Sequence, residues 1–146
     1  MKKVIIATVV AAAFSTANAF ELGVSVGKDK KVDENVYVLS SGTSLAGLKV
    51  SADATLAKDK YVSVGGSVGK QYNVWKVGVT PHVGAAYVQS DMRGKESGAV
   101  AGVGVELSLP VTKGIAIVGD YTYNWDIQNK TDFQGGLFTA GIRLTF

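Results

Sequence analysis

Apolar and polar residues alternate with a period of two along most of the chain after residue 19. Seven segments alternate clearly, and an eighth, over residues 35–41, does so more weakly. This is the period of extended strands whose two faces meet different surroundings, and no comparable segment beyond residue 19 has a helical period. The pattern therefore predicts an all-β protein, with its clear strands over residues 20–27, 46–56, 61–69, 75–87, 98–109, 115–125 and 138–146.

The segment before these strands is predicted to be a secretory signal. Met1 is followed by two lysines, by an uninterrupted apolar run over residues 4–14, and by the small residues Ala17 and Ala19 at the positions that signal peptidase reads. The apolar run is too short for a helical membrane anchor, which needs about 20 residues. We therefore expect residues 1–19 to be cleaved as a signal peptide and residues 20–146 to form one domain.

The number of strands follows from the 127 residues that remain of the 146. Eight strands leave about 16 residues for each strand with its connection, and a strand that crosses a membrane needs about 9–11 of them. Turn-like residues at 41–43, 69–71 and 110–113 alternate with charged segments at 28–34, 58–60, 89–97 and 127–134. This order fits antiparallel strands with short turns and both termini at one end, and with longer loops at the other.

The two faces of the predicted strands differ in a way that favours a membrane barrel. A soluble barrel carries many charges on its outward face, whereas the polar face here is mainly glycine and small hydroxyl residues. The apolar face is mostly Val, Ala, Leu and Ile, with aromatic residues near the strand ends, as lipid-facing strands have. Since every backbone group must be satisfied in lipid, the sheet has to close. We predict an eight-stranded antiparallel up-and-down transmembrane β-barrel.

Two sets of residues follow from this assignment. A lumen charge network of balanced sign is predicted to fill the narrow interior, and it comprises Glu21, Lys49, Asp53, His82, Glu106, Asp120 and Arg143. An aromatic girdle is predicted at the two membrane interfaces, and it comprises Phe20, Trp75, Tyr87, Tyr121, Tyr123, Trp125, Phe138 and Phe146. Pro81 interrupts a regular strand and is expected to mark a bulge, because proline donates no ladder hydrogen bond.

Composition excludes several kinds of chemistry. The absence of cysteine excludes disulfides, thiolate zinc sites and cysteine nucleophiles, and a single histidine argues against a His-rich metal site. We therefore expect no cofactor. The formal net charge of +3 falls to +1 without Lys2 and Lys3, which leaves nucleic-acid binding without an electrostatic basis.

The signal, the alternating segments and the last strand together resemble the small outer-membrane β-barrels of Gram-negative bacteria, the Ail/OmpX and opacity-like proteins. In that family a terminal phenylalanine, preceded by apolar residues at alternate positions, is read by the outer-membrane assembly machinery. The resemblance implies residence in the cell outer membrane among its lipids and lipopolysaccharide, transient contact with that machinery, and an assembly signal at Phe138, Ala140, Ile142, Leu144 and Phe146. The family often has long ligand-binding surface loops, whereas the loops here are short.

His82 is the one imidazole on which a Ser-His or His-Asp mechanism could rest. Some outer-membrane barrels are enzymes that modify lipid A, but the strand register places His82 on the lumen side, with no serine within two residues. We therefore predict a packed luminal histidine and no enzymatic activity. The luminal charges could also form an ion path, but an eight-stranded interior is usually filled, so we predict that they pair with one another.

The sequence thus predicts a monomeric, non-enzymatic outer-membrane barrel that acts through short extracellular loops, in surface interaction, adhesion or envelope integrity. Its surface ligand is left open, although Lys58, Lys60, Arg93 and Lys95 could contact lipopolysaccharide phosphates. Three alternatives also stay open: a lipid A-modifying enzyme that uses His82, a narrow porin-like ion channel, and a soluble periplasmic β-barrel.

Overall fold

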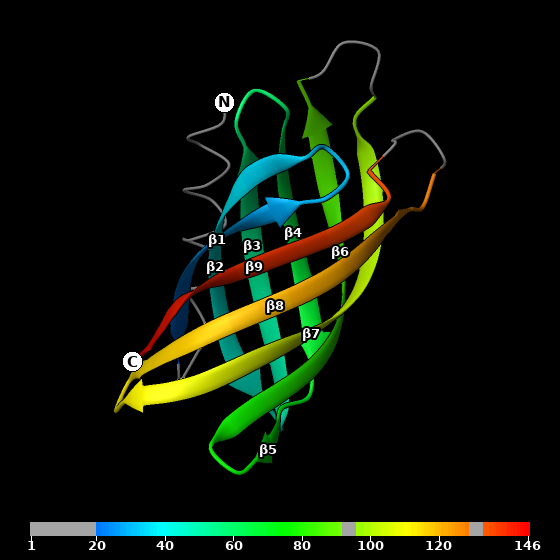
Figure 1. The fold of residues 1–146 in the computed structure, drawn as a ribbon. Helices are drawn as coiled ribbons and strands as arrows, with labels where there is room; N and C mark the ends of the chain where they lie inside the picture. The colour runs from blue at the N-terminus through cyan, green and yellow to red at the C-terminus, as the bar shows by residue number, and fades with distance from the viewer. Residues whose placement is uncertain (1–19, 92–95, 129–132) are drawn as a thin grey trace.

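All regular structure in the described part of the chain is β-strand. The computed structural model describes residues 20–91, 96–128 and 133–146, so the predicted signal peptide lies outside the described residues. No helix in these ranges is long and apolar enough to cross a membrane. The strands, labelled in Figure 1, are β1 (Glu21–Asp29), β2 (Glu34–Leu45), β3 (Leu48–Ala57), β4 (Tyr61–Gly69), β5 (Tyr72–Val74), β6 (Val77–Ser90), β7 (Gly98–Thr112), β8 (Ile115–Asp126) and β9 (Gly135–Thr145).

The eight long strands close into an antiparallel barrel, which confirms the predicted fold (Figure 1). Strand β4 pairs with β6, and the first strand, β1, pairs with the last, β9, in an unbroken register from Glu21↔Thr145 to Asp29↔Leu137. The short strand β5 folds back on the start of β6, and this hairpin extends the barrel wall at one end. The weakly alternating segment at residues 35–41 is confirmed as part of β2.

The connections at the two ends of the barrel differ in kind. At one end, which we call the loop end, lie the four charged connections β1–β2, β3–β4, β6–β7 and β8–β9. At the other, the turn end, lie both ends of the barrel chain and the tight turns at residues 46–47, 75–76 and 113–114. Left-handed backbone at Ala46 (φ 50°), Gly47 (φ 80°) and Gly114 (φ 86°) makes two of these turns possible.

The turn predicted at residues 41–43 is wrong, because these residues lie inside β2. The turn predicted at residues 110–113 is only partly right, because residues 110–112 lie inside β7 and only Lys113 belongs to the turn at residues 113–114. Gly42 stands opposite Glu21 on the inner face, which takes small residues of the same types that turns take, whereas Ser41 stands opposite Leu22 on the outer face. A turn-like composition therefore does not separate a tight connection from a crowded stretch of wall.

The bulge expected at Pro81 is also absent. The β6–β7 register runs without a break through Pro81↔Val105. Pro81 falls between Val79, the last β6 residue to pair with β5, and His82, the first to pair with β4. Pro81, which has no backbone N–H, therefore lies where the pairing partner of β6 changes from β5 to β4. The register shift occurs instead in β7, between Pro110 and Thr112.

The apolar face of the barrel points outward, as predicted. Val103 is 46% exposed and Ile142 is 55% exposed on the outer wall, where a soluble protein would bury them. The intervening residues point inward, among them the buried Arg143 and Thr139 of β9. The interior is therefore the polar side of the sheet, and it is where charged side chains meet.

Candidate functional site in the barrel interior

A cluster of four charges, which we call the charge cluster, crosses the lumen towards the turn end. Lys49 Nζ lies 3.0 Å from Glu21 Oε2 and 3.0 Å from Glu106 Oε1. Arg143 Nε lies 3.3 Å from Glu21 Oε2, and its Nη2 donates to Glu106 Oε2. Each of the four charges therefore has two partners of opposite sign, and the cluster is neutral. Since a buried charge is costly unless it is paired, this arrangement fits a filled interior.

The strands bring these charges together from different walls. Glu21 begins β1, Lys49 stands near the start of β3, Glu106 lies in β7 and Arg143 lies near the end of β9. Alternation turns each of them inward, and the small diameter of an eight-stranded barrel lets long side chains meet across the lumen. The sequence therefore predicts which residues point inward, whereas the closure of the sheet decides which of them pair.

A second polar group lies next to the charge cluster. His82 Nε2 is 2.6 Å from Asp120 Oδ2, and Thr122 Oγ1 donates to Asp120 Oδ1 at 2.7 Å. Asp120 stands opposite Glu106 in the β7–β8 ladder, so the two groups adjoin. Asp53 lines the same interior from β3. The structure thus gathers the predicted lumen charge network within one interior, with Glu21, Lys49, Glu106 and Arg143 in one cluster and His82 with Asp120 in another.

A cavity of about 170 Å³ lies among these groups. Serine, threonine and asparagine side chains line it together with Asp53, His82 and Asp120, and apolar side chains such as Val88, Val100 and Phe133 line it as well. A cavity of this size has room for on the order of ten water molecules. The lumen therefore has room for water beside its charged side chains.

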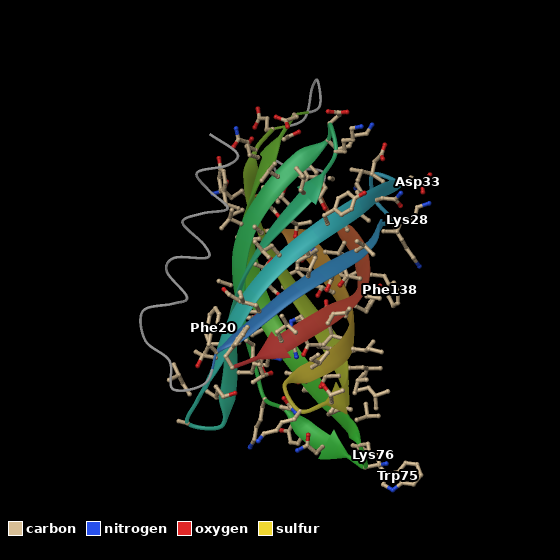
Figure 2. The ribbon with its side chains drawn as sticks, turned by 90° about the vertical axis from the view of Figure 1, so that its left-hand side faces the viewer. Phe20, Lys28, Asp33, Trp75, Lys76 and Phe138 are labelled. Carbon is tan, nitrogen blue, oxygen red and sulfur yellow. The ribbon has the colours of Figure 1, made fainter. Side chains whose placement is uncertain are left out.

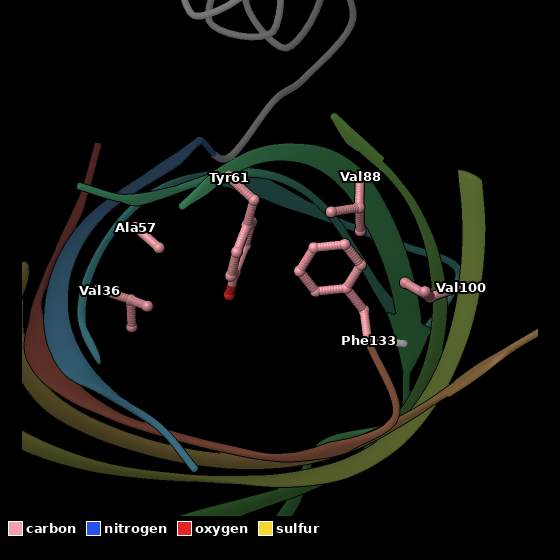
Figure 3. Close-up of a cluster of buried hydrophobic side chains, with 6 residues drawn as sticks. All are labelled: Val36, Ala57, Tyr61, Val88, Val100 and Phe133. Atoms are coloured by element: carbon pink, nitrogen blue, oxygen red, sulfur yellow. The ribbon is translucent and has the colours of Figure 1, made fainter. Parts of the chain in front are cut away.

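An apolar cluster, which we call the loop-end plug, lies inside the barrel at the loop end (Figure 3). The rings of Tyr61 and Phe133 meet edge to face, with centroids 5.0 Å apart. The Tyr61 hydroxyl donates to Asp29 Oδ2 at 2.6 Å, and the Lys31 N–H donates to Asp29 Oδ1 at 2.8 Å, which ties the plug to the β1–β2 loop. The plug consists of Val36, Ala57, Tyr61, Val88, Val100 and Phe133.

The sequence did not predict this plug, although it holds part of the signal. Tyr61, Val88 and Val100 are apolar residues at inward-facing positions, each within three residues of a loop-end strand terminus. At these positions an apolar residue stands where the alternating pattern otherwise has a polar one, and all of them lie near the loop end of the lumen. Phe133 belongs to a connection, and nothing in a two-residue period places it inside the barrel.

The predicted girdle residues on strands face outward, as Tyr87, Tyr121 and Phe138 show with exposures of 59%, 42% and 52%. Trp75 is the departure: it lies in the turn between β5 and β6 rather than on a strand, and it is fully exposed (Figure 2). The apolar positions of the predicted assembly signal lie on the outer face of β9 and at the chain end, where the Phe146 ring stacks on Phe20 at 6.3 Å. The girdle and assembly roles stay predictions.

The described residues show only some of the groups that catalysis, metal binding or lipopolysaccharide contact would need. His82 and Asp120 form a dyad, and the contacts of the described residues place no serine hydroxyl on His82. No three potential metal ligands gather within the described ranges. Of the basic residues considered for lipopolysaccharide contact, Lys60 pairs with Glu34 at 3.8 Å, and Arg93 and Lys95 lie outside the described residues.

Comparison with solved structures shows the fold of outer-membrane β-barrels, while no family model and no curated protein matches the sequence. The N-terminal β-barrel domain of Pseudomonas aeruginosa OprF is 15% identical, with a TM-score of 0.68 over 89% of this chain and 98% of that domain. The Yersinia pestis outer membrane protein Ail is 11% identical, with a TM-score of 0.60 over 88% and 99%. The outer membrane enzyme PagL is 11% identical, with a TM-score of 0.56 over 86% and 98%.

These likenesses place the chain in the class of eight-stranded outer-membrane β-barrels by fold. They confirm the fold that the sequence resemblance implied. They extend over nearly the whole of each compared barrel, so the chain matches complete barrels rather than fragments.

Proposed function

We propose that this protein is a monomeric integral barrel of the cell outer membrane, exported by its signal peptide and non-enzymatic. It acts through its short extracellular loops, in surface interaction, adhesion or envelope integrity. The observation that carries the proposal is the combination of an apolar outer face with an interior that side chains occupy at both ends. The charge cluster occupies one part of the lumen and the loop-end plug another, so a macromolecular partner has to be met at the surface.

The loop end offers such a partner charges of both signs. Lys28 Nζ lies 2.7 Å from Asp33 Oδ1, and the Lys28 ammonium lowers the pKa of the Asp33 carboxyl by hydrogen bonding and charge attraction. The connections are also tied to one another, because the Asp91 N–H donates to the Lys60 carbonyl at 2.7 Å. A surface that has paired charges of both signs, and whose loops are hydrogen-bonded to one another, suits the recognition of a polar partner.

Fractionation combined with gel migration tests the membrane assignment. We expect the protein in the outer-membrane fraction, and we expect its band to shift on boiling, since a closed barrel resists detergent until it is heated. A mature chain that stays soluble without detergent and does not shift would contradict the proposal and would favour a soluble periplasmic barrel. The outward exposure of Val103 and Ile142 argues against that outcome.

An ion channel is the alternative that the luminal charges suggest. With the charge cluster paired and the loop-end plug in place, we expect no steady conductance in planar bilayers. Steady conductance that changes in Arg143→Ala or Glu106→Ala would favour the channel over our proposal.

A lipid A-modifying enzyme is the second alternative, and the His82–Asp120 contact together with the likeness to the outer membrane enzyme PagL favours it. A hydrolase of the serine type needs a nucleophile on the other imidazole nitrogen. Incubation of the purified barrel with lipid A, read by mass spectrometry, tests this. Conversion that disappears in His82→Ala would establish the enzyme, and no conversion is the result that we expect.

A further inference from the structure

We propose that the turn end of the barrel is a binding surface for anionic phospholipid headgroups, with the β5–β6 hairpin as its projecting part. The turn-end surface comprises residues 45–48, 70–76 and 111–114. This inference rests on the proposed membrane location and adds to it the class of lipid that the turn end selects.

Charge separates the two ends of the molecule. The turn-end surface carries three lysines, Lys70, Lys76 and Lys113, all exposed, and none of its residues is acidic. The loop end mixes both signs and pairs them, as in Lys28 with Asp33. The turn-end surface, as defined by these residues, therefore has side-chain charges of a single sign, and this is complementary to anionic headgroups.

The apolar part of this surface continues the lipid-facing wall. Tyr72 stands opposite Val79 in the β5–β6 ladder, and Val79 stands opposite Leu107 in the β6–β7 ladder. Directly opposed residues of antiparallel strands share a face. Leu107 is 50% exposed on the outer wall, so Tyr72 at 51% and Val74 at 63% extend that wall beyond the end of β4. The hairpin thus carries the apolar band from the barrel wall to the lysines at its base and tip.

Neither the fold nor side-chain packing explains why a tryptophan stands at position 75. Trp75 is 100% exposed and has φ 63°, a left-handed conformation that costs a non-glycine residue about 1–2 kcal/mol. Glycine or asparagine would suit this turn better. Figure 2 shows Trp75 beside Lys76 at the far tip of the hairpin. An amphipathic ring next to a cation suits the headgroup region of a bilayer, and Lys70 repeats the combination, 5.7 Å from the Tyr72 ring centroid.

Fluorescence of Trp75 tests the proposal directly. In Trp125→Phe protein reconstituted in vesicles, Trp75 is the only tryptophan. Brominated phosphatidylglycerol and brominated phosphatidylcholine are compared at equal mole fraction, with the total content of each headgroup held constant. We expect quenching by the brominated phosphatidylglycerol to be greater by about twofold or more, because its headgroup has a net negative charge that the lysines attract, whereas the phosphatidylcholine headgroup has no net charge. The difference should disappear in the turn-end variant Lys70→Gln/Lys76→Gln/Lys113→Gln.

A matched variant controls for the number of charges removed. Lys30→Gln/Lys31→Gln/Lys58→Gln neutralises three exposed lysines at the loop end, and it should leave the preference at Trp75 unchanged. Equal quenching by the two lipids, or a preference that survives in the turn-end variant, overturns the proposal. Trp75 that neither lipid quenches also overturns it, and would indicate that the hairpin meets water or a soluble partner.

The same vesicles separate this proposal from the proposed function. A barrel that floats with the vesicles and shifts on boiling, but shows no lipid preference, overturns the lipid selection alone. A chain that neither floats nor shifts overturns the membrane assignment itself.

Discussion

At the scale of single residues, two factors determine how side chains pack in the interior: the room that small residues leave and the pairing of opposite charges. Glu21, Lys49, Glu106 and Arg143 satisfy one another across a lumen too narrow for four independent hydration shells. Glycines in the facing strands leave room for the larger side chains. Removing one charge and filling one glycine are therefore two separate tests of the same interior.

Replacing Arg143 by alanine leaves Glu21 and Glu106 with Lys49 as the one remaining cation of the charge cluster. We expect a loss of about 3 kcal/mol in the free energy of unfolding, because two buried carboxylates each lose one of their two cationic partners. Urea unfolding in phospholipid vesicles, followed by tryptophan fluorescence, measures it. Lys28→Ala is the control: it breaks an exposed pair and should have no measurable effect. Equal urea midpoints for Arg143→Ala and the unmutated protein would show that the charge cluster does not stabilise the fold.

Gly104 makes room for His82. A Cβ at this position would lie 2.6 Å from His82 Cε1 and 2.6 Å from the Tyr121 carbonyl oxygen, and the second of these atoms belongs to the backbone. We expect Gly104→Ala to lower the free energy of unfolding by about 1–3 kcal/mol. Gly119→Ala on β8 is the matched control, because the nearest atom to its Cβ is 3.9 Å away, and we expect no loss there. The same unfolding assay compares the two, and equal losses would contradict this account of the lumen.

At the scale of elements, much of the strand order could be predicted from the sequence. Period-two alternation depends only on which side of the sheet a residue faces, so it located all eight wall strands. Turn positions could not be predicted as well, because Ser41 and Gly42 lie inside β2 and Pro110 lies inside β7, although serine, glycine and proline are also the residues that favour turns. A local sequence pattern also could not predict which charges of the cluster pair with each other. Lys49 and Glu106 are 57 residues apart and meet only when β1 closes on β9.

A disulfide across the β1–β9 seam tests closure. The chain has no cysteine, so Val24→Cys/Ile142→Cys gives a single possible pair at directly opposed positions. We expect it to form on oxidation of the folded protein and to change non-reducing gel migration after boiling. Val24→Cys/Val103→Cys is the control, because β1 and β7 are separated by β9 and β8 and should not cross-link. A seam pair that stays reduced in folded protein would show that the sheet is open.

At the scale of the whole molecule, the usual distribution of side chains in a soluble protein is inverted. Large apolar side chains such as Val103 and Ile142 face outward, and the charged groups with their cavity lie inside. Among the described residues, the buried apolar side chains of the loop-end plug cluster inside the barrel, near the end where the charged loops lie. The proposed location in a membrane and the proposed recognition at the loops both depend on this inversion.

A nitroxide scan along β8 tests the inversion most directly. Single cysteines at residues 117–125 of the cysteine-free chain are spin-labelled in the reconstituted barrel, and collision with oxygen, which concentrates in lipid, is measured at each. We predict a period of two, with high oxygen accessibility at Ile117, Tyr121 and Tyr123 and low accessibility at Asp120 and Thr122. A reversed period, or uniform accessibility along the strand, would contradict the account.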